Sequence, residues 1–269
     1  MSTSKPILCG SIAGSIGGLG IKMHNAAFQA LGLPYTYVSF EPTDAKGAID
    51  AMRALGIRGL GVTMPYKEDV VAHLDHLDEI SKEIGAVNTI VNDSGILTGY
   101  NTDGYGAMST LLEATDLTSK RCAVLGAGGG GKTIAWALRA YTDQIMLYNR
   151  SKERGQAAAN RFGIEFGGDL SQVGKWSYDV LINCTSVGFK SDVSPLTSDQ
   201  LISGALLMDI IFAPAVTTLQ KQAQAQGMTV LSGTRMIMHQ ALKQFELYTG
   251  VDAPLPIYEK AINDSIAGK

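Results

Sequence analysis

Two charged residues in the first half of the chain have the types and settings that acid–base chemistry requires. Lys67 follows an apolar stretch and a proline turn in VTMPYK (62–67), and Asp103 precedes a predicted helix in YNTDG (100–104). Both come at the end of an apolar strand, where open α/β sheets place their ligand sites. If the strands are neighbours, the ammonium and the carboxylate can pair, hold a substrate hydroxyl and move its proton. A surface salt bridge is the alternative, and it is the commoner fate of either residue alone.

A glycine-rich stretch, VLGAGGGGKT (124–133), satisfies two phosphate-binding motifs at once. From Gly126 to Gly131 it matches the dinucleotide fingerprint G-x-G-x-x-G, and with the Lys-Thr pair that follows it matches the P-loop. Both motifs place backbone N–H groups at a helix N-terminus, where an anion is stabilised. A tight strand-to-helix turn that binds nothing is a third interpretation.

The residues after the next predicted strand favour the dinucleotide interpretation. A Rossmann unit presents a residue to the adenosine ribose about 20 residues beyond the glycine loop. Here the strand end in YNRSKER (148–154) offers Asn149 and Arg150, with Arg154 following, and has no carboxylate at that point. Guanidinium groups bind a 2′-phosphate in a bidentate way, whereas a carboxylate would repel it. The stretch therefore predicts NADP rather than NAD, unless the two arginines merely solvate a helix start.

The P-loop interpretation needs an Asp at the end of an apolar strand to help hold Mg²⁺. Asp209, which ends LLMD, fits that pattern, although any buried strand can end in Asp. This interpretation leaves Lys67 and Asp103 without a role. A P-loop phosphotransferase therefore stays as an alternative from a different class of protein.

Strand-like and helix-like segments alternate along the chain and must position these groups. Predicted strands lie at 7–10, 35–40, 57–63, 87–93, 121–126, 144–149, 178–185 and 205–211, with a last one at TVLS. Predicted helices lie at 43–56, 106–114, 131–141, 151–162 and 216–227, with long helical stretches at the C-terminal end. Such alternation predicts an α/β fold with largely parallel sheets. Glycine-rich turns at 10–20 and 126–131 indicate two α/β domains with a cleft between them.

Composition excludes several classes of protein. The 269 residues carry a net charge of −3, and 45% of them are hydrophobic. This balance is ordinary for a globular protein and gives no sign of a nucleic-acid surface. No apolar run has the length of a signal peptide or of a membrane span. The three cysteines are scattered without metal-ligand spacing, so we expect no metal site and a cytoplasmic location.

Seven stretches, in order, resemble the shikimate dehydrogenase family. The family motif V-T-x-P-x-K is matched by VTMPYK, G-A-V-N-T by GAVNTIV, and N-T-D-G by NTDG. Its glycine loop G-A-G-G-A is matched by GAGGGG, N-R-T-x-x-R by NRSKER, N-A-T-S-x-G by NCTSVG, and its final helix by MIMHQALKQFELYTG. The resemblance spans residues 9–250. It implies an N-terminal α/β substrate domain, residues 1–103 plus returning helices at 236–269, and a C-terminal Rossmann NADP-binding domain, residues 104–235.

The resemblance also implies an activity, the reversible NADP-dependent reduction of 3-dehydroshikimate to shikimate in aromatic amino acid biosynthesis. Lys67 would exchange a proton with the reacting oxygen, and Asp103 would hold that lysine and a ring hydroxyl. Thr63, Asn88 and Gln240 would bind the substrate. Because the nicotinamide supplies the hydride, the protein needs only to position the substrate and polarise its reacting group. The implied cofactor-binding residues are Gly126, Ala127, Gly128, Gly129, Gly130, Asn149, Arg150, Arg154, Thr185, Ser186, Val187 and Gly233.

The sequence departs from the family where the substrate carboxylate should be held. The family grips this group with S-x-S-P just before the H-N that opens its first helix. In GSIAGSIGGLGIKMHN the serine positions are Gly18 and Gly20, and a substrate tyrosine is replaced by Phe212. Each lost charge-assisted hydrogen bond typically costs about 1.5–3 kcal/mol. The candidate replacements are Ser11, Ser15, Lys22 and the backbone N–H groups of the glycine loop.

This pattern resembles the shikimate dehydrogenase-like branch, and we expect slow turnover of shikimate. A quinate or quinate/shikimate dehydrogenase is the first alternative, because the glycines leave room for the extra hydroxyl of quinate. A non-catalytic NADP(H) sensor with the same fold is another. The expected partner is a small cyclic hydroxy acid rather than nucleic acid or a membrane, and we expect a monomer or a homodimer.

Overall fold

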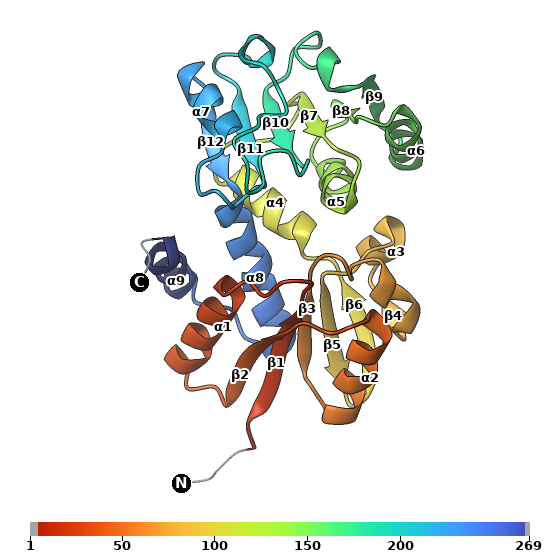
Figure 1. Ribbon diagram of the computed structural model, residues 1–269, viewed down its shortest axis with the longest axis vertical. Helices are drawn as coiled ribbons and strands as arrows, with labels where there is room; N and C mark the ends of the chain where they lie inside the picture. The colour runs from red at the N-terminus through yellow and green to blue at the C-terminus, as the bar shows by residue number, and fades with distance from the viewer. Residues whose placement is uncertain (1–4, 267–269) are drawn as a thin grey trace. The chain divides into compact units, whose positions relative to one another are not determined.

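The chain is divided between two compact units. The computed structural model describes residues 5–266; unit 1 consists of Met1–Thr102 and Gln240–Lys269, and unit 2 of Asp103–His239 (Figure 1). Residues 1–4 and 267–269, which the sequence assigns to the first domain, lie outside the described residues. No helix within 5–266 is both long enough and apolar enough to cross a membrane.

Unit 1 is built around a six-stranded sheet with the order β2-β1-β3-β5-β6-β4. The strands are β1 (Ile7–Ile12), β2 (Tyr35–Phe40), β3 (Gly59–Val62), β4 (His76–Leu77), β5 (Thr89–Asp93) and β6 (Ile96–Tyr100). β1 runs parallel to β2 and β3, whereas β5 runs antiparallel to β3 and to β6. The sheet is therefore mixed.

The β5–β6 hairpin corrects the expectation of a largely parallel sheet in this unit. Its turn residues Ser94 and Gly95 have φ values of 54° and 97°. Positive φ at both central positions gives a turn whose twist matches the flanking strands. Because β5 is reversed, its first residues lie at the same edge of the sheet as the last residues of β3 and β6. Thr63 follows β3 and Asn88 precedes β5 at that edge.

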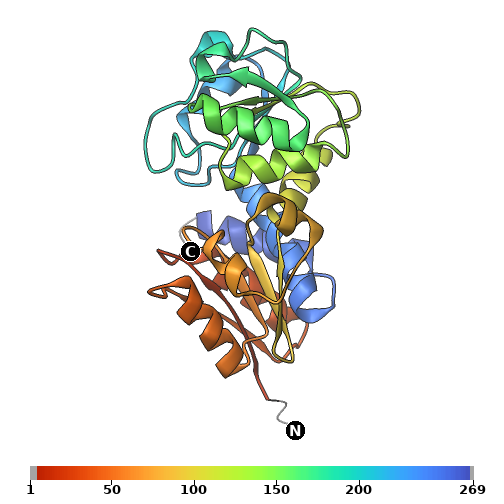
Figure 2. The same ribbon diagram turned by 90° about the vertical axis from the view of Figure 1, so that its right-hand side faces the viewer.

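Helices cover both faces of this sheet (Figures 1 and 2). They are α1 (Leu19–Ala30), α2 (Ala45–Leu55), α3 (Glu79–Ile84), α9 (Leu255–Ile266), the second half of α8 (Gly233–Thr249) and the short 3₁₀ helix Asp69–His73. α2 packs Ile49 and Met52 with Leu60 of β3 in an aliphatic core. The Asp44 side chain, which accepts a hydrogen bond from the Gly47 N–H, caps the start of α2. A second, aromatic core joins α1, α8 and α9 to the sheet through His24, Phe28, Tyr37, Phe245, Tyr248 and Tyr258.

Unit 2 has the doubly wound architecture of dinucleotide-binding domains. Its six strands are β7 (Cys122–Leu125), β8 (Ile145–Tyr148), β9 (Glu165–Gly168), β10 (Val180–Asn183), β11 (Leu206–Asp209) and β12 (Thr229–Ser232). All are parallel, in the order β12-β11-β10-β7-β8-β9. The order reverses between β7 and β10, and ligands of open α/β sheets bind at such a switch point. The predicted α/β fold with a Rossmann-type second domain is confirmed.

The helices of unit 2 are α4 (Asp103–Leu112), α5 (Gly129–Leu138), α6 (Lys152–Phe162), α7 (Thr218–Ala225) and the first half of α8, with short 3₁₀ helices at Leu170–Gln172 and Ser198–Gln200. Figure 2 shows α5 and α6 on one face of the sheet. The three central strands, CAVL, VLIN and LLMD, are buried throughout. Continuous apolar runs of this kind are typical of parallel strands that are covered on both faces.

Candidate functional site

At the edge of the unit 1 sheet where β3 and β6 end and β5 begins, two neighbouring residues hold the predicted segments VTMPYK and YNTDG. The Val87 N–H donates to the Lys67 carbonyl oxygen at 2.8 Å. The next residue, Asn88, accepts the N–H of Thr102 on its side-chain oxygen, also at 2.8 Å. Thr102 directly precedes Asp103, which is 5% exposed and begins α4. The two residues that precede β5 thus hold the backbone of Lys67 and of Thr102, the residue before Asp103.

Asn88 lies at the centre of a buried hydrogen-bond network. Its side-chain oxygen also accepts from the Thr89 hydroxyl at 2.8 Å, and its amide nitrogen donates to the Thr102 hydroxyl at 3.0 Å. The same nitrogen lies 3.5 Å from the side-chain oxygen of Gln240, so two predicted substrate residues lie together. Gln244, which the sequence does not single out, donates to Thr89 at 3.0 Å and so joins α8 to this network. Thr63, which follows β3, is exposed at the same edge.

The loop between β1 and α1 occupies the place of the family's carboxylate-binding serines. Its Gly14 N–H donates to the Met64 carbonyl oxygen at 3.0 Å, which joins the loop to the VTMPYK segment. α1 begins at Leu19, well before the His-Asn pair that opens the helix in the family pattern. Gly18 is therefore the N-cap residue, with no side-chain hydrogen bond, and Gly20 lies in the first turn.

The proposed serine and lysine replacements lie in different settings around this loop. The Ser11 hydroxyl is 2.7 Å from the Ser39 hydroxyl, inside the β1–β2 pair. Ser15 is exposed in the loop, and Lys22 is exposed in the first turn of α1. Ser15 and Lys22 thus lie outside the core, whereas Ser11 forms part of the sheet.

Tyr37 is a buried residue that the sequence does not reveal. A Cβ at Gly20 would lie 3.7 Å from its hydroxyl, and a Cβ at Gly61 would lie 3.0 Å from it. The Tyr37 ring stacks on His24 at a centroid distance of 4.4 Å, and the His24 Nδ1 lies 2.9 Å from the Tyr258 hydroxyl. Burial lowers the pKa of His24 to about 3, so this histidine is neutral and acts as part of the core.

The glycine loop of unit 2 is shaped by contacts that only glycine allows. Gly126 has φ of 98°, and a Cβ there would lie 3.2 Å from the Cys184 carbonyl oxygen. A Cβ at Gly131 would lie 1.8 Å from the Gly126 carbonyl oxygen. At Gly128 and Gly129, in contrast, a Cβ would meet nothing within 4 Å. The loop therefore folds tightly on itself at both ends and leaves an open space before the N-terminus of α5, where a phosphate fits.

The residues after β8 brace this loop and add positive charge. The side-chain oxygen of Asn149 accepts the Ala127 N–H at 2.9 Å, and its amide nitrogen donates to the Ser151 carbonyl oxygen at 2.7 Å. Asn149 thus holds the loop in place. Arg150 and Arg154 are exposed, and neither guanidinium has an ion-pair partner within residues 5–266. They are available to a phosphate.

The other predicted cofactor residues lie after the ends of β10 and β12. Thr185 donates from its N–H (3.1 Å) and its hydroxyl (2.8 Å) to the side-chain oxygen of Asn183. The Val187 N–H then donates to the Thr185 hydroxyl at 3.2 Å, and Ser186 between them is exposed. Gly233, the first residue of α8, would place a Cβ 2.3 Å from the Ile210 carbonyl oxygen. These segments flank the switch point from the side opposite the glycine loop.

The P-loop alternative lacks support in unit 2. Asp209, the candidate magnesium residue, is fully buried and accepts hydrogen bonds from Asn183, Ile211 and Thr217. Its oxygens are therefore engaged by protein donors.

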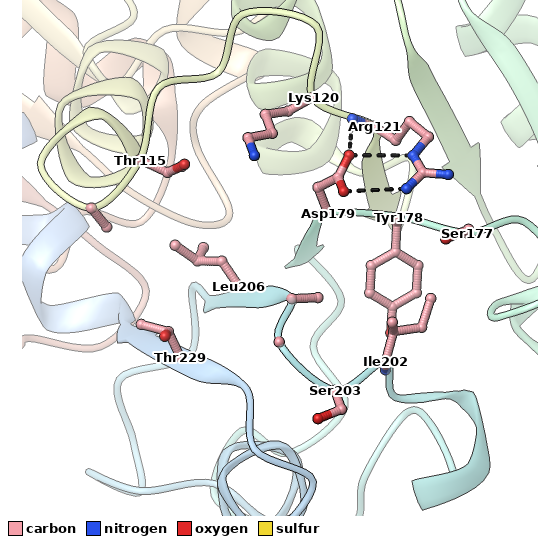
Figure 3. Close-up of a pocket in the computed structure, with 13 residues that line it drawn as sticks. Thr115, Lys120, Arg121, Ser177, Tyr178, Asp179, Ile202, Ser203, Leu206 and Thr229 are labelled. Atoms are coloured by element: carbon pink, nitrogen blue, oxygen red, sulfur yellow. Dashed lines mark hydrogen bonds and ion pairs between the residues drawn. The ribbon is translucent and has the colours of Figure 1, made fainter.

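A cavity of about 370 Å³ lies in unit 2 at the opposite edge of the sheet (Figure 3). It is lined by residues that precede β7, β10 and β11 and includes the Arg121–Asp179 ion pair, in which Arg121 Nη2 lies 3.2 Å from Asp179 Oδ1. The N-terminal ends of parallel strands are not where open α/β sheets bind their ligands. We therefore place the candidate site at the C-terminal ends.

The fold and these sites define an α/β protein with one dinucleotide-binding unit and one unit that gathers polar groups at a sheet edge. Residues 17–90 match the family described as "Shikimate dehydrogenase substrate binding domain". The chain is 42% identical over 236 residues to the shikimate dehydrogenase (NADP(+)) of Thermococcus kodakarensis, a match that covers 85% of each chain. The protein belongs to the shikimate dehydrogenase family, as its sequence motifs predict.

Solved structures agree with this assignment. The chain is similar to a shikimate 5-dehydrogenase from Thermus thermophilus in complex with NADP(H) and shikimate, with 30% identity and a TM-score of 0.90 over 96% of this chain and 99% of that one. It is also similar to a shikimate 5-dehydrogenase-like protein, with 31% identity and a TM-score of 0.86 over 100% of both chains. Relatives of both the main family and the dehydrogenase-like branch thus share the fold.

Proposed function

We propose that this protein catalyses the reversible NADP-dependent reduction of 3-dehydroshikimate to shikimate or of a close cyclic relative. The observation that carries the proposal is that Asn88 lies against Gln240, while the preceding residue, Val87, holds the backbone of Lys67 at the same edge of the unit 1 sheet. Relatives named shikimate dehydrogenase (NADP(+)), and the Thermus thermophilus structure with NADP(H) and shikimate, support both the substrate class and the cofactor.

The residues of unit 2 fit NADP. The open space at Gly128 and Gly129 admits a pyrophosphate close to the backbone, and the N-terminus of α5 stabilises its charge. The exposed guanidinium groups of Arg150 and Arg154 suit the 2′-phosphate of the adenosine ribose. When bound, the nicotinamide supplies the hydride.

The residues of unit 1, together with Asp103 at the start of unit 2, provide substrate binding and proton transfer in this proposal. Lys67 gives a proton to the carbonyl oxygen as it is reduced and takes it back in the reverse direction. Asp103 holds the lysine and a ring hydroxyl. Asn88, Thr63 and Gln240 bind the remaining hydroxyl groups. Each polar group lost from such a site lowers selectivity, because substrate hydroxyls would then be left without a partner.

A quinate/shikimate oxidoreductase is the second candidate, and one feature of the loop favours it. Cβ atoms at Gly17 and Gly18 would meet nothing within 4 Å, so this part of the loop is open. Quinate carries an extra hydroxyl on the carbon that bears its carboxylate, and an open loop leaves room for it. We place either enzyme in the cytoplasm, in keeping with the free thiols of Cys9, Cys122 and Cys184.

The proposal is tested by NADP⁺ reduction with shikimate, quinate and related cyclic hydroxy acids, measured as steady-state kcat/KM for each. We expect measurable turnover of shikimate with NADP⁺ as the better cofactor. A clear preference for quinate would select the second candidate. NADPH binding without turnover of any of these acids would favour the non-catalytic sensor.

A further inference from the structure

The buried side chain of Asp209 accepts more hydrogen bonds than the fold alone explains. The carboxylate lies at the end of β11 with no exposed surface. One oxygen accepts from the Asn183 amide at 3.0 Å and from the Ile211 N–H at 3.2 Å. The other accepts from the Thr217 hydroxyl at 2.6 Å, with the Gln220 amide at 3.5 Å. All four donors are neutral, and their residues are buried as well.

Within residues 5–266 no cationic side chain pairs with the buried Asp209 carboxylate, and burying a carboxylate without such a partner costs free energy. Burial raises the pKa of Asp209, and the hydrogen bonds oppose that rise. An apolar pair of similar volume commonly serves stability as well as a buried charged group does. Only a carboxylate, however, offers two oxygens that accept from donors on both sides at once. The residue type thus suits a junction that must hold several segments in a fixed arrangement.

The first of those segments is the turn after β10. Asn183 donates to Asp209 with its amide nitrogen and uses its amide oxygen to accept from Thr185, at 3.1 Å from the N–H and 2.8 Å from the hydroxyl. The Thr185 hydroxyl in turn accepts the Val187 N–H at 3.2 Å. A continuous chain of hydrogen bonds therefore leads from the buried carboxylate to the exposed end of the turn.

The second segment is the loop between β11 and α7. Asp209 holds its first part through the Ile211 N–H and its last residue through the Thr217 hydroxyl. Thr217 also accepts the Gln220 N–H at 3.2 Å and so caps α7. The Lys190 N–H donates to the Ala213 carbonyl oxygen at 2.8 Å, which joins this loop to the residues that follow the turn after β10.

We propose that Asp209 is a positioning residue that holds these two segments in the arrangement that receives the nicotinamide half of NADP. The inference rests on the proposed function, because it assigns Thr185 and Val187 to the cofactor. The two segments follow the adjacent strands β10 and β11, on the far side of the switch point from the glycine loop, where a dinucleotide extends across an open α/β sheet. Groups that are held by hydrogen bonds to a buried residue in this way are already in place before the ligand binds.

The test is a set of NADPH titrations in which the fluorescence of the cofactor reports binding. The melting temperature of each variant is measured in parallel. Asn183→Asp places a second carboxylate against Asp209, and we expect the Kd for NADPH to rise on the order of tenfold or more. In the double variant Asn183→Asp/Asp209→Asn the amide and the carboxylate exchange places. The exchange restores every hydrogen bond of the junction except the one from the Ile211 N–H, so we expect a Kd within about threefold of the wild-type value.

Thr142→Val is the matched control. The Thr142 hydroxyl is buried, donates to the Lys120 carbonyl oxygen and accepts the Gln144 N–H, at the opposite edge of the same sheet. We expect this variant to lose stability without losing NADPH affinity. If Asn183→Asp does not fold, Asp209→Asn alone serves as the test. In that variant the amide nitrogen replaces one carboxylate oxygen and faces donors that it cannot accept from.

Two results would overturn the inference while leaving the proposed function intact. One is a double variant that binds NADPH no better than Asn183→Asp. The other is a set of Asp209 and Asn183 variants that all bind NADPH as tightly as the Thr142→Val control. A wild-type protein that does not bind NADPH at all would instead contradict the proposed function.

Discussion

Replacing Gly131 by alanine tests whether the glycine loop owes its shape to contact with its own backbone. The added methyl carbon would lie 1.8 Å from the Gly126 carbonyl oxygen, whereas ordinary contact begins at 3.4 Å. The carbonyl must therefore retreat by more than an ångström. Gly126 itself packs closely against the turn after β10, because a Cβ there would lie 3.2 Å from the Cys184 carbonyl oxygen. Overpacking of this kind costs about 1–3 kcal/mol.

The measurements are a thermal unfolding curve and an NADPH titration. At about 2–4 °C per kcal/mol, we expect Gly131→Ala to lower the melting temperature by about 2–12 °C. We also expect it to weaken NADPH binding on the order of tenfold, because the loop moves. Gly129→Ala is the control for stability. Its methyl group meets nothing within 4 Å, and alanine favours the helix by up to about 1 kcal/mol over glycine. If Gly131→Ala melts like Gly129→Ala and binds NADPH like the wild type, the reasoning is refuted.

Three further predictions concern charge and protonation. Arg154→Ala should raise the KM for NADP⁺ about tenfold and leave that for NAD⁺ unchanged, since it removes a charge-assisted bond that is partly screened by solvent; Arg139→Ala is the control, and an equal loss for NAD⁺ would contradict the assignment. Lys67→Ala should lower kcat by about 10²- to 10⁴-fold with unchanged NADPH affinity, because it removes the proton donor; retained turnover would argue against that role. His24, with a pKa of about 3, binds no proton in the folded protein between pH 3 and 6.5, whereas the unfolded chain does. Stability should therefore fall by about 1.4 kcal/mol per pH unit below pH 6.5 until the folded pKa is reached; His24→Phe should remove this slope in urea unfolding curves, and an unchanged slope would count against it.

The regular parts of the fold can be predicted from the sequence because their signals are local. The stretch YTYVSF has the predicted bounds of β2, and the strand predicted at 205–211 is present as β11, although it ends at Asp209. The hairpin of β5 and β6 is the exception. The turn signal Ser-Gly is short, and β6 follows it too closely to be recognised as a separate strand. The mixed sheet follows from that one turn.

The start of α1 is hidden for a different reason. A helix is usually signalled by a side chain that caps it, and here the cap position is Gly18, which has none. The loop before it resembles an irregular glycine-rich segment, so the sequence gives no sign that Gly20 belongs to a helical turn. The roles predicted for Ser15 and Lys22 stay predictions.

The supporting residues of the sites depend on contacts between distant parts of the chain. Tyr258 and His24 are 234 residues apart, and Gln244 and Thr89 are 155 apart. No local sequence pattern predicts contacts between residues so far apart. Asp209 is visible in the sequence as the end of a strand, but its four donors come from two separate segments. The sequence therefore identifies the groups that face a ligand better than the groups that hold them.

The division of unit 1 between the two ends of the chain has a consequence for its synthesis. Unit 2 is continuous, from Asp103 to His239, and can fold as soon as those residues have left the ribosome. Unit 1 lacks Tyr248, which packs against Gly59, and Tyr258, whose hydroxyl is hydrogen-bonded to His24, until the residues after unit 2 have been made. Residues 5–102 therefore complete their core only after the whole of unit 2 has been made. Until Tyr248 and Tyr258 are made, the aromatic core of unit 1 is incomplete, so the nascent chain exposes apolar surface in this unit while unit 2 is being synthesised.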